Sequence, residues 1–376
     1  MKTGIALASL GLVTALAACG AASAPASRVP GCTSAVTRAP RLAGRPRFVP
    51  LPGTPFAAVA SRDGRHVFVS MPGKTGGKIG VLARRSGSWR LVRTVAVPMW
   101  TWGLALDPTG GYLLVADGAG IAVLDPGKLV AGAGDPVASF SPTAADGSVE
   151  VAVAPRRRLA FASDEFGGTV SVFALGRTGA PRPRLVGRIR VPPDPVGMAL
   201  SSDGRTLYVT SETNARNGEP GMLSVVDVAG AVRAPAHAVV ASVPAGCSPV
   251  RVAVAPDGGT VWVTARGSDA LLAYSASRHP ALRAVVRVGR APVGLAFLGR
   301  FVLVADSNRF AGGTAPQTVS VVDAGAALAG RHAVLGELPA GAFPREVSVL
   351  PASSGLVVTN FASHSLELVP AAVLPH

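Results

Sequence analysis

The chain has 376 residues, of which 48% are hydrophobic and only 15% are charged, with 45 glycines and 32 prolines. Its 36 basic residues are nearly all arginine and outnumber 21 acidic residues, which gives a formal net charge of +15. An arginine skew combined with so much alanine, glycine and proline is typical of a GC-rich genome, so charge alone does not indicate a nucleic-acid partner. After the first twenty residues, no segment is long and apolar enough to span a membrane without a charge.

The N-terminus has the features of an export signal. Lys2 precedes an apolar stretch from Ile5 to Ala15, and Leu16-Ala17-Ala18-Cys19 follows. This tetrapeptide resembles the lipobox of bacterial lipoproteins, in which the cysteine is diacylated and becomes the new N-terminus. We therefore predict a lipoprotein signal peptide over residues 1–18 and a lipid anchor on Cys19, which would hold the exported protein at the outer leaflet of the cell membrane. The alternative is an ordinary cleaved signal peptide in which Cys19 has no role.

Residues 19–46 are predicted to form a linker, because they are rich in Ala, Pro, Ser and Arg and show no hydrophobic period. If Cys19 carries lipid, Cys32 and Cys247 remain as an even pair in an oxidising compartment. We predict a disulfide between these two cysteines, and two free thiols are the alternative.

A pattern repeated seven times fills residues 47–376. The pattern is a proline and a small residue leading an apolar strand, then a Pro/Asp/Gly turn and a β-branched strand. Anchored two residues after the proline, the copies fall at Ala57, Gly103, Glu150, Gly197, Arg251, Gly294 and Glu346. A period in the forties with about four short strands per copy is the signature of a β-propeller blade. We predict one all-β domain, a seven-bladed β-propeller, with the strands of blade 4 at 195–200, 206–211, 222–227 and 239–243.

The last copy supplies only three strands, expected at 346–350, 356–359 and 365–369. Residues 47–51 have the composition of an outer strand but no sheet of their own. Pairing 47–51 with 365–369 would close the ring and remove both free sheet edges. The propeller is therefore expected to be closed by an N-terminal strand.

Short strand motifs resemble a known repeat family. Val357-Val358-Thr359-Asn360, Tyr208-Val209-Thr210 and the run from Thr318 to Asp323 look like the YVTN-repeat (YncE-like) propellers, whose relatives include seven-bladed lactonase-like propellers. The resemblance covers roughly residues 47–370 and implies the propeller fold. It transfers no catalytic residue, because no lactonase residue falls on a matching motif in this sequence.

Superposing the repeats singles out the anchor position at the mouth of the central channel. Four blades carry Ala or Gly there, whereas blades 3, 5 and 7 carry Glu150, Arg251 and Glu346. Three charges facing one channel need partners or a ligand. One interpretation is an internal Glu-Arg-Glu ion network that plugs the channel, and the other is a ligand-binding site.

A second set of polar residues follows the second strand of successive blades, on the face that we call the top. It comprises Asp117, Asp164, Glu165, Glu212, Arg266, Asp306 and Asn360. The acidic sector Asp117, Asp164, Glu165 and Glu212 could bind Ca²⁺ through carboxylate oxygens, or its members could be solvated or turn-forming acids. The long loops 211–221 and 306–317 flank blade 5 on this face, and Trp100 and Trp102 lie at the entry to blade 2.

These features favour a monomeric, lipid-anchored propeller that binds a small anionic ligand or a protein partner at its top face, without catalysis and without a required cofactor. The expected ligand-binding residues are Glu150, Arg251, Arg266, Glu346 and Glu212. The alternative is a lactonase-like hydrolase in which Glu150 or Glu346 is the base and Arg251 holds negative charge. A nucleic-acid partner is not expected, because no aromatic residues interleave with the surface arginines.

Overall fold

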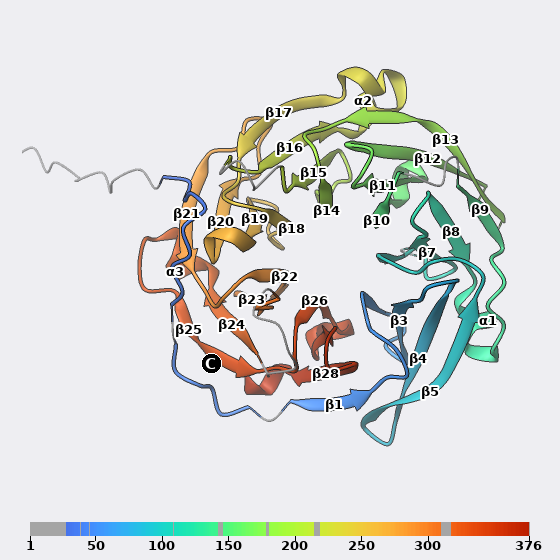
Figure 1. Ribbon diagram of the computed structural model, residues 1–376, viewed down its shortest axis with the longest axis horizontal. Coiled ribbons are helices and arrows are strands. Elements are labelled where there is room, and N and C mark those ends of the chain that lie inside the picture. Colours follow the sequence, from blue (N-terminus) through green and yellow to red (C-terminus); the bar gives the residue numbers. More distant parts are fainter. Residues whose placement is uncertain are drawn as a thin grey trace, which may run out of the picture.

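A computed structural model describes residues 28–37, 39–44, 46–107, 109–141, 146–177, 180–213, 219–309 and 317–375. Seven four-stranded antiparallel sheets stand around a central axis (Figure 1). The innermost strand of each sheet contacts the innermost strands of both neighbouring sheets, so the ring is continuous. The prediction of an all-β, seven-bladed propeller is confirmed.

Each of the first six blades is built from four consecutive strands, running from the axis outward. Blade 1 comprises β2 (Ala58–Ala60), β3 (His66–Pro72), β4 (Gly77–Arg85) and β5 (Ser88–Val97). Blade 2 comprises β6 (Leu104–Leu106), β7 (Leu113–Ala116), β8 (Ile121–Leu124) and β9 (Ala138–Phe140). Blade 3 comprises β10 (Ser148–Ala154), β11 (Leu159–Asp164), β12 (Thr169–Arg177) and β13 (Ala180–Arg190).

The remaining blades follow the same plan. Blade 4 comprises β14 (Pro195–Leu200), β15 (Thr206–Ser211), β16 (Met222–Asp227) and β17 (Val239–Pro244), as the sequence predicts to within one residue. Blade 5 comprises β18 (Pro249–Val254), β19 (Thr260–Ala265), β20 (Ala270–Ser275) and β21 (Leu282–Arg287). Blade 6 comprises β22 (Pro292–Leu298), β23 (Phe301–Asp306), β24 (Thr318–Asp323) and β25 (Val334–Pro339). Blade 7 comprises β26 (Pro344–Val349), β27 (Gly355–Asn360), β28 (Ser365–Pro370) and β1 (Arg47–Pro50).

Three short α-helices lie at the outer rim (Figure 1) and follow the third strand of blades 2, 4 and 6. They are α1 (Pro126–Ala131), α2 (Val228–Arg233) and α3 (Ala324–Leu328). Each begins directly after an aspartate, Asp125, Asp227 or Asp323, whose carboxylate accepts hydrogen bonds from backbone N–H groups of the first turn. Such N-caps satisfy donors that have no partner inside the helix. The 3₁₀ helices are η1 (Pro155–Arg157), η3 (Pro235–His237), η4 (Arg266–Ser268), η5 (Pro351–Ser353) and η6 (Ala371–Val373).

A repeated hydroxyl near the end of the second strand ties neighbouring blades together. Thr210 Oγ1 donates to the carbonyl of Val250 at 2.8 Å, and Thr264 Oγ1 donates to that of Val293 at 2.6 Å. Ser70 makes the corresponding bond to Trp102 at 2.6 Å. These buried bonds explain why the repeated motif ends in Thr or Ser, and they fix the backbone around the central channel.

The innermost strands of several blades contain a register shift where they enter the channel. In β26, Pro344 pairs with Asn360 and Glu346 with Thr359, so Arg345 is an extra, unpaired residue. The same shift leaves Val149 and Val196 unpaired in β10 and β14. A β-bulge of this kind re-aims the side chain of the extra residue. Consecutive residues can therefore both face the axis.

The ring is closed by residues from the two ends of the propeller. Strand β1 pairs antiparallel with β28, with Arg47 opposite Leu368 and Pro50 opposite Ser365. Val49 and Leu51 are buried in the hydrophobic cluster that lies between blades 7 and 1. Strand β1 thus supplies the outer strand that the last copy of the repeat lacks.

The described part of the predicted linker runs along the outside of blades 5 and 6 (Figure 1). A disulfide joins Cys32 to Cys247, with the two Cα atoms 4.9 Å apart. Thr37 N then donates to Val288 O at 3.1 Å, and Leu42 N donates to Glu337 O at 2.9 Å. The described residues 31–37 and 39–44 therefore form a strap between the disulfide and β1.

Residues 1–27, including the predicted signal peptide and Cys19, lie outside the described residues. Among the residues that are described, no helix is long and apolar enough to cross a membrane.

Candidate functional site

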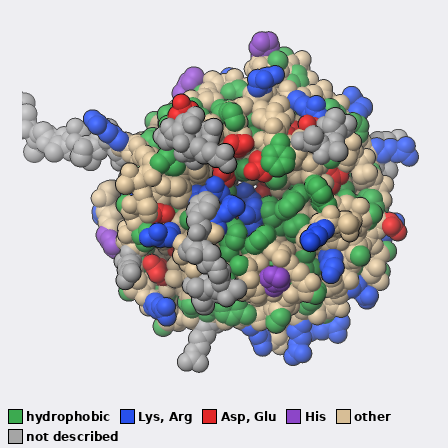
Figure 2. Space-filling view, in the orientation of Figure 1, with side chains coloured by type: hydrophobic (Ala, Val, Ile, Leu, Met, Phe, Trp, Pro, Cys, Tyr) green, Lys and Arg blue, Asp and Glu red, His purple; other side chains and the backbone are tan. Residues whose placement is uncertain are grey.

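A funnel-shaped cavity of about 640 Å³ opens at the centre of the top face. Its floor is formed by the residue that precedes the anchor position in six of the seven blades: Phe56, Trp102, Val149, Val196, Val250 and Arg345. Its walls come from residues that follow the second strands and from the blade entries, among them Trp100, Glu165, Phe166, Glu212, Arg266, Phe343 and Phe361. Figure 2 shows acidic, basic and hydrophobic side chains gathered around the central hollow.

The structure brings together the three charged anchor residues at the bottom of this funnel. Arg251 Nε lies 2.8 Å from Glu346 Oε2, and Arg251 Nη2 lies 3.1 Å from Glu150 Oε2. Arg251 Nη1 also donates to the carbonyl of Val196 at 2.8 Å. The three side chains come from blades 3, 5 and 7 and are only 7% to 17% exposed. They form the internal ion network that one of the two interpretations expects.

Glycines at the anchor position make room for this network. A Cβ added at Gly103 would lie 2.8 Å from Glu150 Cα, and one added at Gly294 would lie 2.9 Å from Glu346 Cα. Each blade with a charged anchor therefore packs its inner strand against a glycine of the preceding blade. This close approach of backbones explains why glycines and charges alternate around the ring.

The network has one cation, Arg251, between the two carboxylates of Glu150 and Glu346. This excess of negative charge, together with burial, sets the pKa values of Glu150 and Arg251. Burial raises the pKa of Glu150 to about 7, against the lowering effect of Arg251, and the charge of Glu346 raises it further. Burial opposes the charged form of Arg251, but Glu346 and Glu150 together raise its pKa above the ordinary value. Arg251 thus stays charged, while Glu150 exchanges a proton near neutral pH.

Arg345 is the feature of the funnel that the sequence analysis missed. Its guanidinium carbon lies 3.7 Å from the ring centroid of Phe56, with Phe361 and Phe343 at 5.8 and 6.0 Å. Its Nε is buried without an acceptor, and its side chain has no hydrogen bond or ion pair with any other described residue. Burial, together with the charge of Arg251, lowers the pKa of Arg345 to about 9. Arg345 therefore presents a positive charge to the cavity at neutral pH, seated on aromatic rings.

Two further predicted residues form a wall of the funnel. Arg266, at the start of η4, makes a two-pronged ion pair with Glu212, at 3.0 Å from Nη1 to Oε1 and 2.5 Å from Nη2 to Oε2. The 3₁₀ turn that carries Arg266 is held by Ser268, whose hydroxyl accepts from Cys247 N and donates to Gly31 O. The strap and its disulfide thus support one wall of the cavity.

The predicted ligand-binding set divides into two groups. Arg251, Arg266 and Glu212 line the funnel. Glu150 and Glu346 are not among its lining residues and contact it through their ion pairs with Arg251. The middle parts of the two long loops, residues 214–218 and 310–316, lie outside the described residues.

The acidic sector that could hold Ca²⁺ is not one cluster. Asp117 accepts from the backbone N–H groups of Ala119 and Gly120, as a turn-forming residue does. Asp164 accepts from the hydroxyls of Ser148, Thr169 and Ser171 at 2.6 to 2.9 Å inside its own blade. Burial raises the pKa of Asp164. Only Glu165 and Glu212 of this sector line the funnel, and the described residues contain no group of three or more potential metal-ligating side chains.

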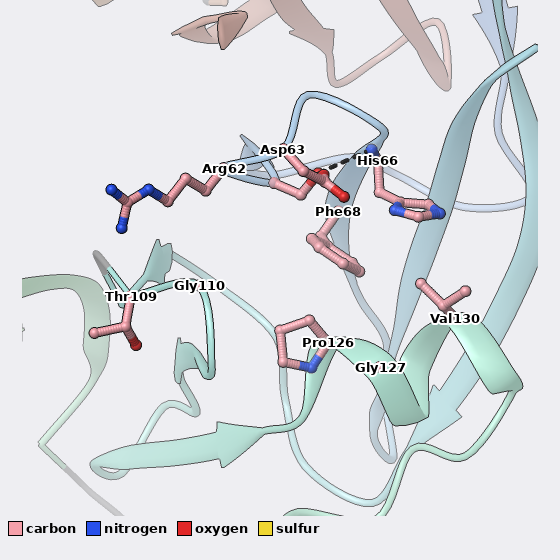
Figure 3. A pocket seen from close by; sticks show the side chains of 10 residues that line it. Arg62, Asp63, His66, Phe68, Thr109, Gly110, Pro126, Gly127 and Val130 are labelled. Carbon is pink, nitrogen blue, oxygen red and sulfur yellow. Dashed lines mark hydrogen bonds between the residues drawn. The ribbon is translucent and has the colours of Figure 1, made fainter. Parts of the chain in front are cut away.

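A second cavity, of about 690 Å³, lies on the opposite face between blades 1 and 2 (Figure 3). Ser61 Oγ donates to Asp63 Oδ1 at 2.5 Å and accepts from His66 N at 2.9 Å. The Ser61 hydroxyl and the Arg65 N–H lower the pKa of the exposed Asp63. These bonds stabilise the turn itself, so the funnel remains the candidate site.

No family model matches the sequence, and no curated protein sequence matches it. Similar solved structures include the hydrazine synthase of Kuenenia stuttgartiensis, at 17% identity and a TM-score of 0.67 over 86% of this chain and 97% of that one. The periplasmic gluconolactonase PpgL of Pseudomonas aeruginosa matches at 22% identity and a TM-score of 0.51, over 62% of this chain and 70% of its own. The Cps50 (Swd1) propeller domain of Myceliophteria thermophila matches at 12% identity and a TM-score of 0.63, over 84% and 96%.

At these identities, the comparisons show the fold alone. The chain is a seven-bladed β-propeller whose structural neighbours include a lactonase-like propeller.

Proposed function

We propose that this protein is an exported, lipid-anchored propeller that binds a small organic anion in its central funnel and does not transform it. The observation that carries the proposal is Arg345, a half-buried guanidinium that lines the cavity over aromatic rings and has no hydrogen bond or ion pair with another described residue. Burying a charge that has no hydrogen bond or ion pair is unfavourable, and an apolar side chain at this position would avoid that cost. An anionic ligand would supply the missing partner.

The size and lining of the funnel support a small ligand with an apolar body. A cavity of about 640 Å³ lies within the range of roughly 300–1,000 Å³ that is usual for small-molecule sites. Trp100, Trp102, Phe56 and Phe166 give it an aromatic lining. A concave site of this kind favours a small molecule over a protein partner, which usually docks on a broad and flatter surface.

The hydrolase alternative has weaker support from the geometry. Glu150 and Glu346, the two bases that it would use, are both paired with Arg251 and lie outside the cavity lining. An assay for lactone hydrolysis, with and without Ca²⁺ and beside an Arg251→Ala variant, decides between binding and catalysis. Turnover by the unaltered protein that the variant abolishes would establish the hydrolase.

Titration calorimetry with 4-methylbenzoate tests the anion site. The Arg345→Gln variant should bind this probe about 10- to 100-fold more weakly, which is the effect of losing a hydrogen bond to a charged group. Its Tm should change little, because the loss of the cation–π contact with Phe56 offsets the removal of a charge that has no ion pair. The control is Arg283→Gln, on the exposed side of β21, which should bind normally. Equal affinity in all three proteins would overturn the proposal.

The lipid anchor needs a separate test. Cys19→Ala should release the protein from the membrane fraction of the producing cell, because it removes the thiol that would carry the acyl chains. Unchanged membrane association of the variant would show that Cys19 is not the anchor.

A further inference from the structure

A second charged side chain in the funnel, Glu165, has no hydrogen-bond or ion-pair partner among the described residues. It follows β11 in blade 3, is half-buried and lines the same cavity as Arg345. No hydrogen bond or ion pair connects its carboxylate to another described residue. Glu212, by contrast, is fully engaged by Arg266. Among the described residues that line the funnel, Glu165 and Arg345 are thus an acid and a cation without a hydrogen bond or ion pair.

These two groups lie on opposite sides of the ring. Arg345 is on β26 of blade 7, and Glu165 belongs to blade 3, so two blades separate them in one direction and three in the other. Arg309 stands on the Arg345 side, over the ring of Phe343 at 5.5 Å. Glu212 stands on the Glu165 side, in the neighbouring blade 4. Arg345 and Glu165, which have no ion pair with another described residue, thus lie across the cavity from each other.

The electrostatics around Glu165 show that this acid lacks compensation. Burial raises its pKa, and the nearby carboxylates of Glu212 and Asp194 raise it further. The lowering effects of Arg345 and Arg251 are smaller. A cationic group placed beside Glu165 would relieve this repulsion. An anionic group placed there would increase it.

Resting on the function proposed above, we infer that the ligand is a zwitterion with a carboxylate and an ammonium group at opposite ends of a flat apolar frame. Its carboxylate would pair with Arg345 and its ammonium with Glu165. Its frame would lie against aromatic side chains of the wall, with Phe166 directly beside Glu165. Each end of the ligand then neutralises a charge that the protein leaves unpaired, and the bound site carries no excess charge from these groups.

Three matched probes test this inference by titration calorimetry. They are 4-(aminomethyl)benzoate, which carries both charges, 4-methylbenzoate, which lacks the ammonium group, and 4-methylbenzylammonium, which lacks the carboxylate. The unaltered protein should bind the zwitterion about tenfold or more tightly than the anion, because it adds one charge-assisted hydrogen bond. The isolated cation should bind weakest, because it would face Arg345 without a compensating carboxylate.

Variants assign the two ends of the ligand. Glu165→Gln should remove the preference for the zwitterion while leaving the affinity for 4-methylbenzoate unchanged or higher. Arg345→Gln should weaken the binding of both probes that carry a carboxylate, 4-(aminomethyl)benzoate and 4-methylbenzoate. The control is Asp135→Asn, in an exposed position between α1 and β9, which should retain the preference. The Tm of each variant shows that it is folded.

The outcomes separate the two proposals. If 4-methylbenzoate binds as tightly as the zwitterion, or if Glu165→Gln keeps the preference, the zwitterion inference is wrong and the anion site stands. If neither carboxylate binds, or if the cation binds tightest, both proposals are wrong.

Discussion

Replacing Arg251 by Met tests the ion network at the bottom of the funnel. The change leaves Glu150 and Glu346 without the cation that lies 3.1 and 2.8 Å from them. Removing one partner of a buried ion pair typically costs about 3–5 kcal/mol, because the remaining charge is uncompensated. An unfolding entropy of roughly 2.1 cal/mol/K per residue, over about 330 residues, converts this cost into a fall in Tm of about 4–7 °C.

The pH dependence of this loss follows from the carboxylates. Glu150 already has a pKa of about 7 with Arg251 present, and losing the cation should raise it further. Protonation neutralises the uncompensated charge, so the deficit of the variant should be largest above pH 8 and should shrink as the pH falls towards 5.5. The assay is thermal unfolding of both proteins at a fixed scan rate across this range.

A triple variant provides the control. Arg251→Met combined with Glu150→Gln and Glu346→Gln removes all three charges and should recover most of the lost Tm. An Arg251→Met protein as stable as the unaltered one at pH 8 would refute the reasoning. It would show that the ion pairs of Arg251 with Glu150 and Glu346 do not stabilise the fold.

Three further predictions concern a buried acid, the closing strand and the disulfide. Burial raises the pKa of Asp306 from 3.8 to about 8, so the folded state keeps a proton that the unfolded state loses, and stability should fall as the pH rises between these values. Asp306→Asn should abolish this fall and raise the free energy of unfolding at pH 8.5 by at most about 6 kcal/mol, because the pKa of Asp306 is shifted by about four units and each unit corresponds to about 1.4 kcal/mol. A variant whose stability depends on pH as that of the unaltered protein does would contradict the raised pKa. Deletion of residues 20–51 should lower the Tm sharply because it removes β1, while deletion of 20–31 should not, and equal melting of the two proteins would refute closure by β1. Mass mapping of protein from the exported compartment should find Cys32 linked to Cys247, and two free thiols would refute the disulfide.

The fold could be predicted from the sequence because each repeat specifies the same local structure. The two-strand pattern recurs seven times, with the anchor proline in five of the copies, and the strands of blade 4 begin where the pattern places them. The strap was less predictable. The linker sequence has no hydrophobic period that would indicate an ordered segment. Its described residues 31–37 and 39–44 are held to the ring by backbone hydrogen bonds to Val288 and Glu337 and by a disulfide.

The site was only partly predictable, and Arg345 shows why. Successive side chains of a regular strand point to opposite faces, so a residue next to Glu346 is expected to point away from the channel. The bulge between Pro344 and Glu346 breaks that alternation and places Arg345 on the funnel floor. Comparing the residue just before the anchor in all seven repeats would have singled out Arg345, because the other six blades have Phe, Trp or Val at that position.

The acidic sector illustrates a second limit of the sequence. Asp164 ends its strand at the top face, where a sequence pattern suggests a solvent-facing acid. Its side chain instead lies across the sheet, next to the hydroxyls of Thr169 and Ser171 on the neighbouring strand. Cross-strand neighbours of this kind depend on the pairing register.

The most direct test of the central claim is a crystal structure of the protein soaked with 4-methylbenzoate. The account predicts that the probe lies in the central funnel, with its carboxylate within hydrogen-bond distance of the Arg345 guanidinium and its ring against the aromatic wall. A probe bound outside the funnel, or inside it without contact to Arg345, would contradict the account.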